Sequence, residues 1–131
     1  MPRSIRFVAA TGLLGLAGAV LGAAPSHAQA DPATGEKLFQ QRCSVCHTLS
    51  AAEKKPTGPH LEKLLGRKAG ADAAYGYSAA MTASGIVWNE KTLNDYLANP
   101  GKVVPGTSMP LAVPRAADRE DIIAYLEAKT K

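Results

Sequence analysis

The sequence of 131 residues contains only two cysteines, Cys43 and Cys46, and they stand three positions apart. A disulfide between them would close almost no loop, so it would stabilise the folded state little by restricting the unfolded chain. Disulfide stabilisation is therefore a poor explanation for this pair, and a chemical role has to be considered.

Aromatic residues are scarce, at 5% of the chain, and no stretch alternates between apolar and polar residues for long enough to form a sheet. The formal net charge of +4 is not gathered in a basic stripe of the kind that binds nucleic acid, so we expect no nucleic-acid partner. A domain this small buries a modest fraction of its surface and is marginally stable by itself. A large buried cofactor would supply the missing apolar volume.

The first thirty residues have the features of a removable signal peptide. Two arginines precede an uncharged run, residues 7–24, that is rich in Ala, Gly, Leu and Val. Small residues then offer cleavage sites after Ala28 or Ala30. We expect residues 1–30 to be the signal and residues 31–131 to form one domain. An uncleaved membrane anchor is the alternative, and the weak hydrophobicity of the run disfavours it.

Helical periodicity dominates the remaining 101 residues. Good N-cap residues followed by apolar residues at inward spacing predict helices after Asp31, Ser78 and Asn89, and a further helix near the C-terminus. The expected helical ranges are 32–42, 79–83, 90–98 and 117–129. The sequence therefore predicts a small all-α domain with four to five short helices.

Two segments rich in Pro and Gly, residues 48–74 and 103–114, predict long connecting loops, the first with one or two helical turns. The first and last helices each have a narrow apolar face, which predicts that they pack on each other. Gly35 would allow a close approach between them.

The most specific chemical signal is the pentapeptide Cys43-Ser44-Val45-Cys46-His47. Positions i, i+3 and i+4 of a helical turn share one face, so two thiols can form thioethers with one porphyrin edge while His47 reaches the iron. Cys-x-x-Cys-His is the attachment signature of haem c. A thioredoxin-like dithiol would need a βαβ context, and a structural zinc site would need four ligands. We therefore expect one haem c, attached through Cys43 and Cys46.

The ligand on the other side of the iron separates electron carriers from haem proteins that bind gases or peroxide. Met81, Met109 and His60 have suitable side chains. Met81 falls in a predicted helix, where methionine usually fills the core, and His60 follows His47 by only 13 residues. Met109 lies in a proline-rich loop with no helical pattern to explain it. These features favour Met109 but leave a structural methionine open.

The chain from about residue 35 to residue 129 resembles class I cytochromes c, both the mitochondrial type and the bacterial cytochromes c2 and c550. The first matching stretches are Gly-Glu-Lys-Leu-Phe (35–39), Cys-Ser-Val-Cys-His-Thr (43–48), Thr-Gly-Pro-His-Leu (57–61) and Leu-Gly-Arg-Lys (65–68). They continue with Gly-Ile-Val-Trp (85–88), Tyr-Leu-Ala-Asn-Pro (96–100), Pro-Gly-Thr-Ser-Met (105–109) and Arg-Glu-Asp-Ile-Ile-Ala-Tyr-Leu (119–126). The resemblance implies an all-α fold wrapped around one covalent haem.

The resemblance also implies roles for individual residues. His47 and Met109 would be the two axial iron ligands, and the backbone carbonyl of Pro59 would accept the Nδ1–H of His47. Four further side chains match positions that contact the haem propionates: Arg67, Tyr77, Trp88 and Thr107. An ordinary surface arginine, core aromatic residues and a turn threonine are the alternative interpretations of these four.

From the resemblance we expect a monomeric electron carrier, not an enzyme, that docks transiently with membrane complexes. The expected N-terminal signal predicts that it is exported to the periplasm. Its donor would be a bc1-type complex or a periplasmic dehydrogenase, and its acceptor a cytochrome oxidase or a reaction centre. The alternative is a peroxidase-like or sensor haem protein in which Met109 leaves the iron. Several lysines that ring the haem edge in mitochondrial members are replaced here, by Pro56, Gly101 and Ser108 among others. This predicts docking that is less sensitive to salt.

Overall fold

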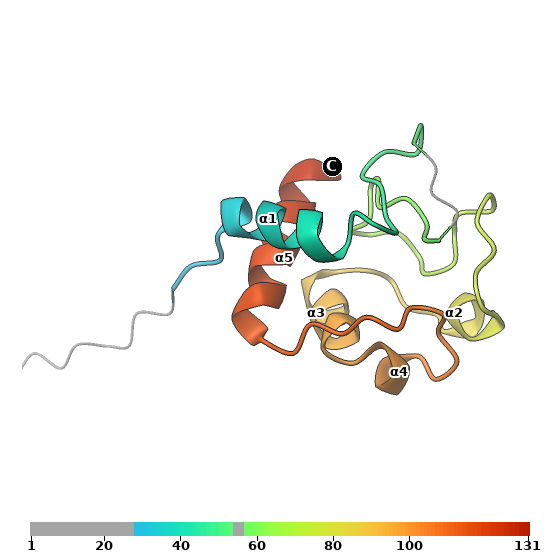
Figure 1. Ribbon diagram of the computed structural model, residues 1–131. Helices are drawn as coiled ribbons and strands as arrows, with labels where there is room; N and C mark the ends of the chain where they lie inside the picture. Colours follow the sequence, from blue (N-terminus) through green and yellow to red (C-terminus); the bar gives the residue numbers. More distant parts are fainter. Residues whose placement is uncertain (1–27, 54–56) are drawn as a thin grey trace, which may run out of the picture.

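The computed structural model describes residues 28–53 and 57–131 of the chain. Five helices lie in this part: α1 (Pro32–Arg42), α2 (Ala79–Ala83), α3 (Glu90–Ala98), α4 (Pro100–Val103) and α5 (Ala116–Lys129) (Figure 1). The described residues contain no named strand, which confirms the all-α prediction. None of their helices is long and apolar enough to span a membrane.

The expected signal peptide falls almost entirely on residues 1–27, which lie outside the described residues. Its apolar run and its removal after Ala28 or Ala30 therefore stay predictions.

Side-chain caps begin three of the helices where the sequence predicted. Asp31 accepts hydrogen bonds from the backbone N–H groups of Ala33 and Thr34, ahead of a proline at the first helical position of α1. Asn89 and Thr92 form a reciprocal capping box at the start of α3. Ser78 caps α2 by a single bond, since its hydroxyl oxygen accepts from the backbone N–H of Met81 at 3.1 Å. Such caps satisfy N–H groups that the helix itself leaves unpaired, so a local signal sufficed to place these helices.

The segment after α3 differs from the prediction. Pro100 ends α3 as expected, but it also begins α4, a single turn that residues 100–103 form. Asn99 serves both helices, because it is the C-cap of α3 and its side chain accepts from the backbone N–H of Lys102 at 3.1 Å. Proline suits a first helical position, where its missing N–H costs nothing.

The long segment 48–74 contains no helix in its described part, so the expected helical turns there are wrong. Lys63 (φ 49°), Gly66 (φ 84°) and Gly70 (φ 73°) adopt left-handed backbone conformations, which interrupt any right-handed helix. The segment is instead fastened to the residues before α3 by an isolated antiparallel bridge between Lys68 and Val87. The backbone N–H of Trp88 donates to the Arg67 carbonyl at 3.0 Å.

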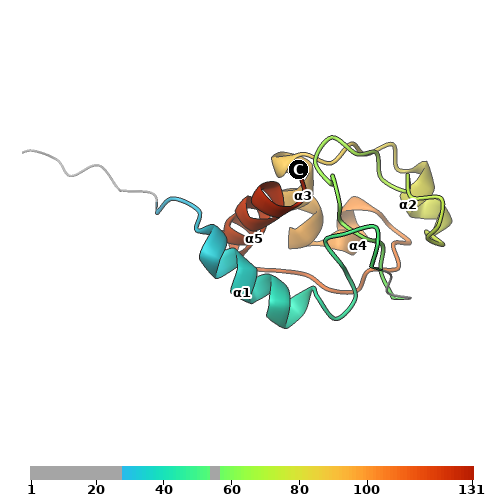
Figure 2. The ribbon, with the colours of Figure 1, turned by 90° about the horizontal axis from the view of Figure 1, so that it is seen from above.

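Helices α1 and α5 pack against each other at one end of the molecule, while α2, α3 and α4 lie beyond them (Figures 1 and 2). At the crossing, a Cβ atom on Gly35 would overlap the backbone carbonyl of Asp121 and lie 2.9 Å from the Cβ of Tyr125. The rings of Phe39 and Tyr125 pack beside it with centroids 5.6 Å apart. Gly35 therefore permits the close approach that the sequence predicted.

Candidate functional site

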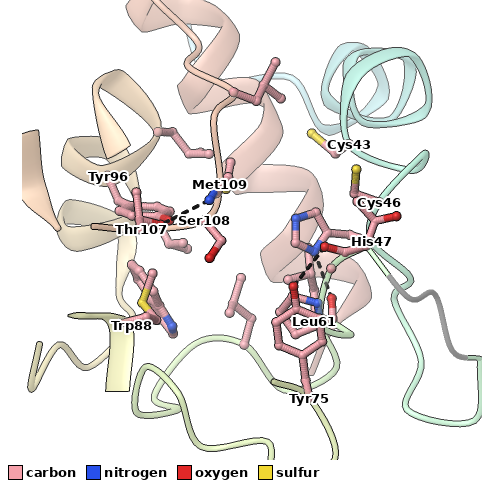
Figure 3. A pocket seen from close by; sticks show the side chains of 18 of the residues that line it. Cys43, Cys46, His47, Leu61, Tyr75, Trp88, Tyr96, Thr107, Ser108 and Met109 are labelled. Carbon is pink, nitrogen blue, oxygen red and sulfur yellow. Dashed lines mark hydrogen bonds between the residues drawn. The ribbon is translucent and has the colours of Figure 1, made fainter. Parts of the chain in front are cut away.

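The attachment sequence folds as a turn that continues α1. The backbone N–H groups of Cys43 and Ser44 both donate to the Phe39 carbonyl, and those of Cys46 and His47 donate to the Cys43 carbonyl at 3.0 and 2.9 Å. This turn places both sulfurs and the imidazole on one wall of a cavity (Figure 3). The two cysteines are not joined by a disulfide.

The cavity has a volume of about 340 Å³ and a mostly apolar lining. Residues from the attachment turn, the segment 57–78, α2, α3, the loop after α4 and α5 all contribute to its wall. It contains every site residue predicted from the sequence: Cys43, Cys46, His47, Pro59, Arg67, Tyr77, Trp88, Thr107 and Met109. The structure thus gathers around one space residues that are spread over 67 positions of sequence.

The protonation of His47 follows from one contact. Its Nδ1 lies 2.8 Å from the backbone carbonyl oxygen of Pro59. Because a carbonyl oxygen can only accept, Nδ1 carries the proton and Nε2 carries the lone pair that a metal ion needs. A Cβ on Gly58 would lie 2.7 Å from the Cys46 carbonyl oxygen and 2.9 Å from the His47 ring, so the backbone here passes close behind the imidazole.

Met109 lies across the cavity from His47 (Figure 3). Its backbone N–H donates to Thr107 Oγ1 at 3.3 Å, and the same Oγ1 lies 2.6 Å from the Tyr96 hydroxyl. The Tyr96 ring in turn packs on Trp88, with centroids 5.2 Å apart. The Met109 loop is therefore tied to α3, and the methionine is held at a defined place on this wall.

Arg67 and Tyr77 add polar groups to the lining. Arg67 Nη1 donates to the Glu62 carbonyl at 2.8 Å, and its Nη2 donates to the His60 carbonyl at 2.7 Å. Burial raises the pKa of Tyr77, and the nearby Arg67 charge opposes part of this rise. Tyr77 therefore stays a neutral O–H donor at physiological pH. The propionate contacts expected of Arg67, Tyr77, Trp88 and Thr107 stay predictions.

Two tyrosines of the site were not predicted as functional residues. Tyr75 lines the cavity, donates its hydroxyl hydrogen to the Thr57 carbonyl at 2.9 Å and meets Tyr77 edge-on at 4.9 Å between ring centroids (Figure 3). It lies in an irregular loop, where no periodicity marks an inward side chain. Tyr96 was expected only as an inward residue of its helix, and its hydrogen bond to Thr107 crosses 11 positions of sequence.

The residues present fit a covalently bound haem. Apolar walls, two thiols, an imidazole with its lone pair on Nε2 and a facing thioether provide the attachment groups and donors that the group requires. Burial raises the pKa of the Cys43 thiol to about 11. A dithiol oxidoreductase needs the opposite shift, because its reactive species is the thiolate.

Comparison with known proteins supports the same interpretation. A family model described as Cytochrome c matches residues 32–129. Cytochrome c of Cochliobolus lunatus is 46% identical over 104 residues, which cover 79% of this chain and 96% of that protein. Cytochrome c of Arabidopsis thaliana is 45% identical over 104 residues, covering 79% and 93%. Cytochrome c type-1 of Ascaris suum is 42% identical over 108 residues, covering 82% and 96%.

These relatives correct the expected location. They are fungal, plant and nematode cytochromes c, proteins of the mitochondrial intermembrane space, so the prediction of a periplasmic location is wrong. That prediction depended on residues 1–30, which lie ahead of the family match.

The family match covers nearly all of the described domain, and the relatives are matched over more than nine-tenths of their own length. The attachment turn supplies both cysteines for one covalent haem c. The chain therefore belongs to the cytochrome c family, whose members carry electrons on a single haem.

Proposed function

We propose that this cytochrome transfers single electrons from a bc1-type complex to a cytochrome oxidase, and that His47 and Met109 would hold the haem iron. One observation supports the proposal above all others. The Nδ1–H of His47 is held by Pro59 at 2.8 Å on one wall of the cavity, and Met109 lies on the opposite wall. Two strong ligands from the protein favour outer-sphere electron transfer over the binding of a reactant at iron.

Haem supplies an iron centre that changes its charge by one electron. Around it, the apolar lining keeps water out and disfavours the more highly charged oxidised state, so the reduction potential should be positive. His47 keeps its proton on Nδ1, because Pro59 accepts it, and presents its lone pair from Nε2. Thr107 and Tyr96 hold the Met109 loop in place, so little rearrangement is needed when the charge changes.

Docking with the membrane complexes is transient in this proposal, and the cytochrome acts as a monomer. Arg42 lies on the cavity wall and Lys102 is exposed, but Gly101 and Ser108 stand where mitochondrial members place lysines. Association should therefore depend less on long-range attraction and less on salt. A periplasmic dehydrogenase is no longer a candidate donor, because the location it requires has been corrected. A reaction centre is excluded as an acceptor for the same reason.

The ligand assignment is tested by the absorption spectrum of the oxidised holoprotein. The weak far-red band of sulfur-to-iron charge transfer should be present in the wild type and absent in Met109→Ala. Met81→Leu is the matched control, because Met81 is a buried methionine that lines the same cavity and leucine preserves its volume. Persistence of the band in Met109→Ala would refute the ligand assignment.

The transport role is tested by rapid mixing. Reduced wild-type protein should be oxidised by a purified cytochrome oxidase, and oxidised protein should be reduced by a bc1 complex, both with second-order kinetics. A peroxidase turnover that exceeds these transfer rates, together with an exchangeable sixth ligand, would instead support the peroxidase-like alternative.

A further inference from the structure

The loop between α4 and α5 carries Met109 and is fastened to α3 on both sides of this residue (Figure 1). Before Met109, Thr107 Oγ1 lies 2.6 Å from the Tyr96 hydroxyl. After it, the backbone N–H of Val113 donates to the Leu97 carbonyl at 2.7 Å. Tyr96 and Leu97 are neighbours on α3, so the span that carries Met109 starts and ends at one place on this helix.

Arg119, in the first turn of α5, strengthens the second fastening. Its Nη1 donates to the backbone carbonyls of Val113 and Pro114 at 2.9 and 2.7 Å, and its Nε donates to Asn94 Oδ1 of α3 at 2.8 Å. A guanidinium carries several N–H donors in one plane, so this one side chain joins the loop, α3 and α5. These three contacts form the Asn94–Arg119 clamp.

The place of Arg119 on its helix indicates that the three contacts outweigh an opposing effect. Arg119 is the fourth residue of α5, and the dipole of a helix disfavours a positive charge near its N-terminus. Hydrogen bonds from a charged donor are stronger than those between neutral groups. Val113 is fully buried, so its carbonyl is shielded from water and would lack a good partner without Arg119.

An outside ligand can reach the iron only if Met109 moves away, and this movement requires the loop to open locally. Thr107 holds the loop two residues before Met109. The clamp holds it at Val113, four residues after Met109. Release of the clamp would therefore free the second side of the span while the first side and the helices stay in place.

We propose that Asn94 and Arg119 are positioning residues that keep the Met109 loop closed and so disfavour the replacement of Met109 by an outside ligand. Arg119 holds the end of the loop, and Asn94 orients the guanidinium through its Nε. The inference rests on the proposed role of Met109 as an iron ligand. An electron carrier needs such a clamp because an exchangeable ligand position would bind reactants at iron.

The test is a titration of the oxidised holoprotein with free imidazole, a nitrogen ligand that binds iron. Loss of the far-red band reports the replacement of Met109. In Arg119→Leu the apparent affinity for imidazole should rise about tenfold or more, because three hydrogen bonds from a charged donor are lost. Arg119→Lys should give a smaller rise, since an ammonium group lacks the planar fork that joins Asn94 and the loop. An unchanged affinity in Arg119→Leu would overturn the inference.

Asn94→Ala tests whether the two residues act as one unit. Alone, this variant should raise the affinity for imidazole by a smaller factor than Arg119→Leu. Added to Arg119→Leu, it should cause no further rise, because Asn94 acts through the guanidinium. An independent effect in the double variant would contradict this role of Asn94. If Arg119→Leu fails to fold, a wild-type affinity in Asn94→Ala would overturn the inference.

Asp31→Ala is the control for general destabilisation. It removes the side-chain cap of α1, which should lower the free energy of unfolding, and it leaves the clamp untouched. Its affinity for imidazole should equal that of the wild type. Equal rises in Asp31→Ala and Arg119→Leu would show that the affinity follows overall stability, and the inference would then be wrong.

Amide hydrogen exchange of the holoprotein gives a second readout, which does not depend on the ligand assignment. The N–H of Val113 should exchange faster in Arg119→Leu than in the wild type, because the clamp no longer holds this end of the loop. The N–H of Cys43 donates to the Phe39 carbonyl at 2.8 Å, far from the loop in sequence, and should keep its wild-type rate. Equal acceleration at both amides would contradict a local clamp.

The inference and the proposed function can fail separately. Absence of the far-red band in the wild type would count against Met109 as an iron ligand, and exchange at Val113 would still report on the clamp. A normal wild-type band, together with identical imidazole affinities and Val113 exchange rates in all variants, would count against the role of Asn94 and Arg119 alone.

Discussion

Gly35 stands where α1 crosses α5, and alanine at this position should separate the two helices. An added Cβ would overlap the Asp121 backbone carbonyl and lie 2.9 Å from the Cβ of Tyr125. Neither atom is the end of a flexible side chain, so relief requires movement of a whole helix. That movement would loosen the contact between Phe39 and Tyr125, whose ring centroids are 5.6 Å apart.

Two effects set the magnitude for Gly35→Ala. Overpacking costs about 1–3 kcal/mol, and a clash with backbone places this site at the upper end of that range. Alanine in a helix interior offsets about 1 kcal/mol through its higher helix propensity. The expected net loss is about 2 kcal/mol in the free energy of unfolding, which corresponds to a fall in Tm of roughly 8–16 °C for a domain of this size.

Guanidinium unfolding of the oxidised holoprotein, followed by far-ultraviolet circular dichroism, measures this loss. Gly101→Ala is the matched control, because Gly101 lies in α4 and the nearest atom to its added Cβ is 4.0 Å away. The control should be neutral or slightly stabilising. The reasoning is refuted if Gly35→Ala is as stable as the wild type, or if both variants lose the same amount.

Other perturbations address the site. Thr107→Val removes the partner of the Tyr96 hydroxyl and of the Met109 N–H. It should lower the free energy of unfolding by about 1–3 kcal/mol, and the far-red band should disappear at a lower denaturant concentration than in the wild type. Loss of the band at the wild-type concentration would contradict a supporting role for Thr107. Burial raises the pKa values of Tyr77 and Tyr96. Ionisation of these tyrosines is therefore easier in the unfolded chain than in the folded one. Their contribution to the free energy of unfolding should be fully present below about pH 10 and should fall above it. The fall should be less steep in Tyr96→Phe. Replacing both attachment cysteines by serine should abolish haem staining on a denaturing gel, while wild-type colour should survive acid–acetone extraction. The transfer rate to cytochrome oxidase should depend weakly on ionic strength, and a steep fall with salt would show that the remaining basic groups dominate docking.

Local chemistry explains which parts of this molecule could be predicted. Asp31 and Asn89 cap helices through contacts within three residues, so sequence alone located the starts of α1 and α3. The attachment signature is equally local, because its chemistry needs the two thiols and the imidazole on a single turn. Gly35 was predicted to allow a close approach because the first and last helices each have a narrow apolar face and glycine has no Cβ.

What escaped prediction depends on an unusual backbone conformation or on contacts between distant residues. Lys63 adopts a left-handed conformation that its residue type does not favour, so the segment around it was expected to be partly helical. Tyr75 reaches the cavity from an irregular loop through a hydrogen bond to Thr57, 18 positions away. The contact of His60 with Asp72 joins two loop residues that no periodicity relates.

The backbone N–H of Asp31 donates to Asp121 Oδ1 at 2.7 Å, which joins the first residue before α1 to α5. If the leader is cut after Ala30, this nitrogen becomes the terminal ammonium group and the contact becomes an ion pair. If the cut follows Ala28, the nitrogen stays a neutral amide. The choice of cleavage site would thus change the charge of a contact between the first and last helices, and with it the free energy of unfolding of the domain.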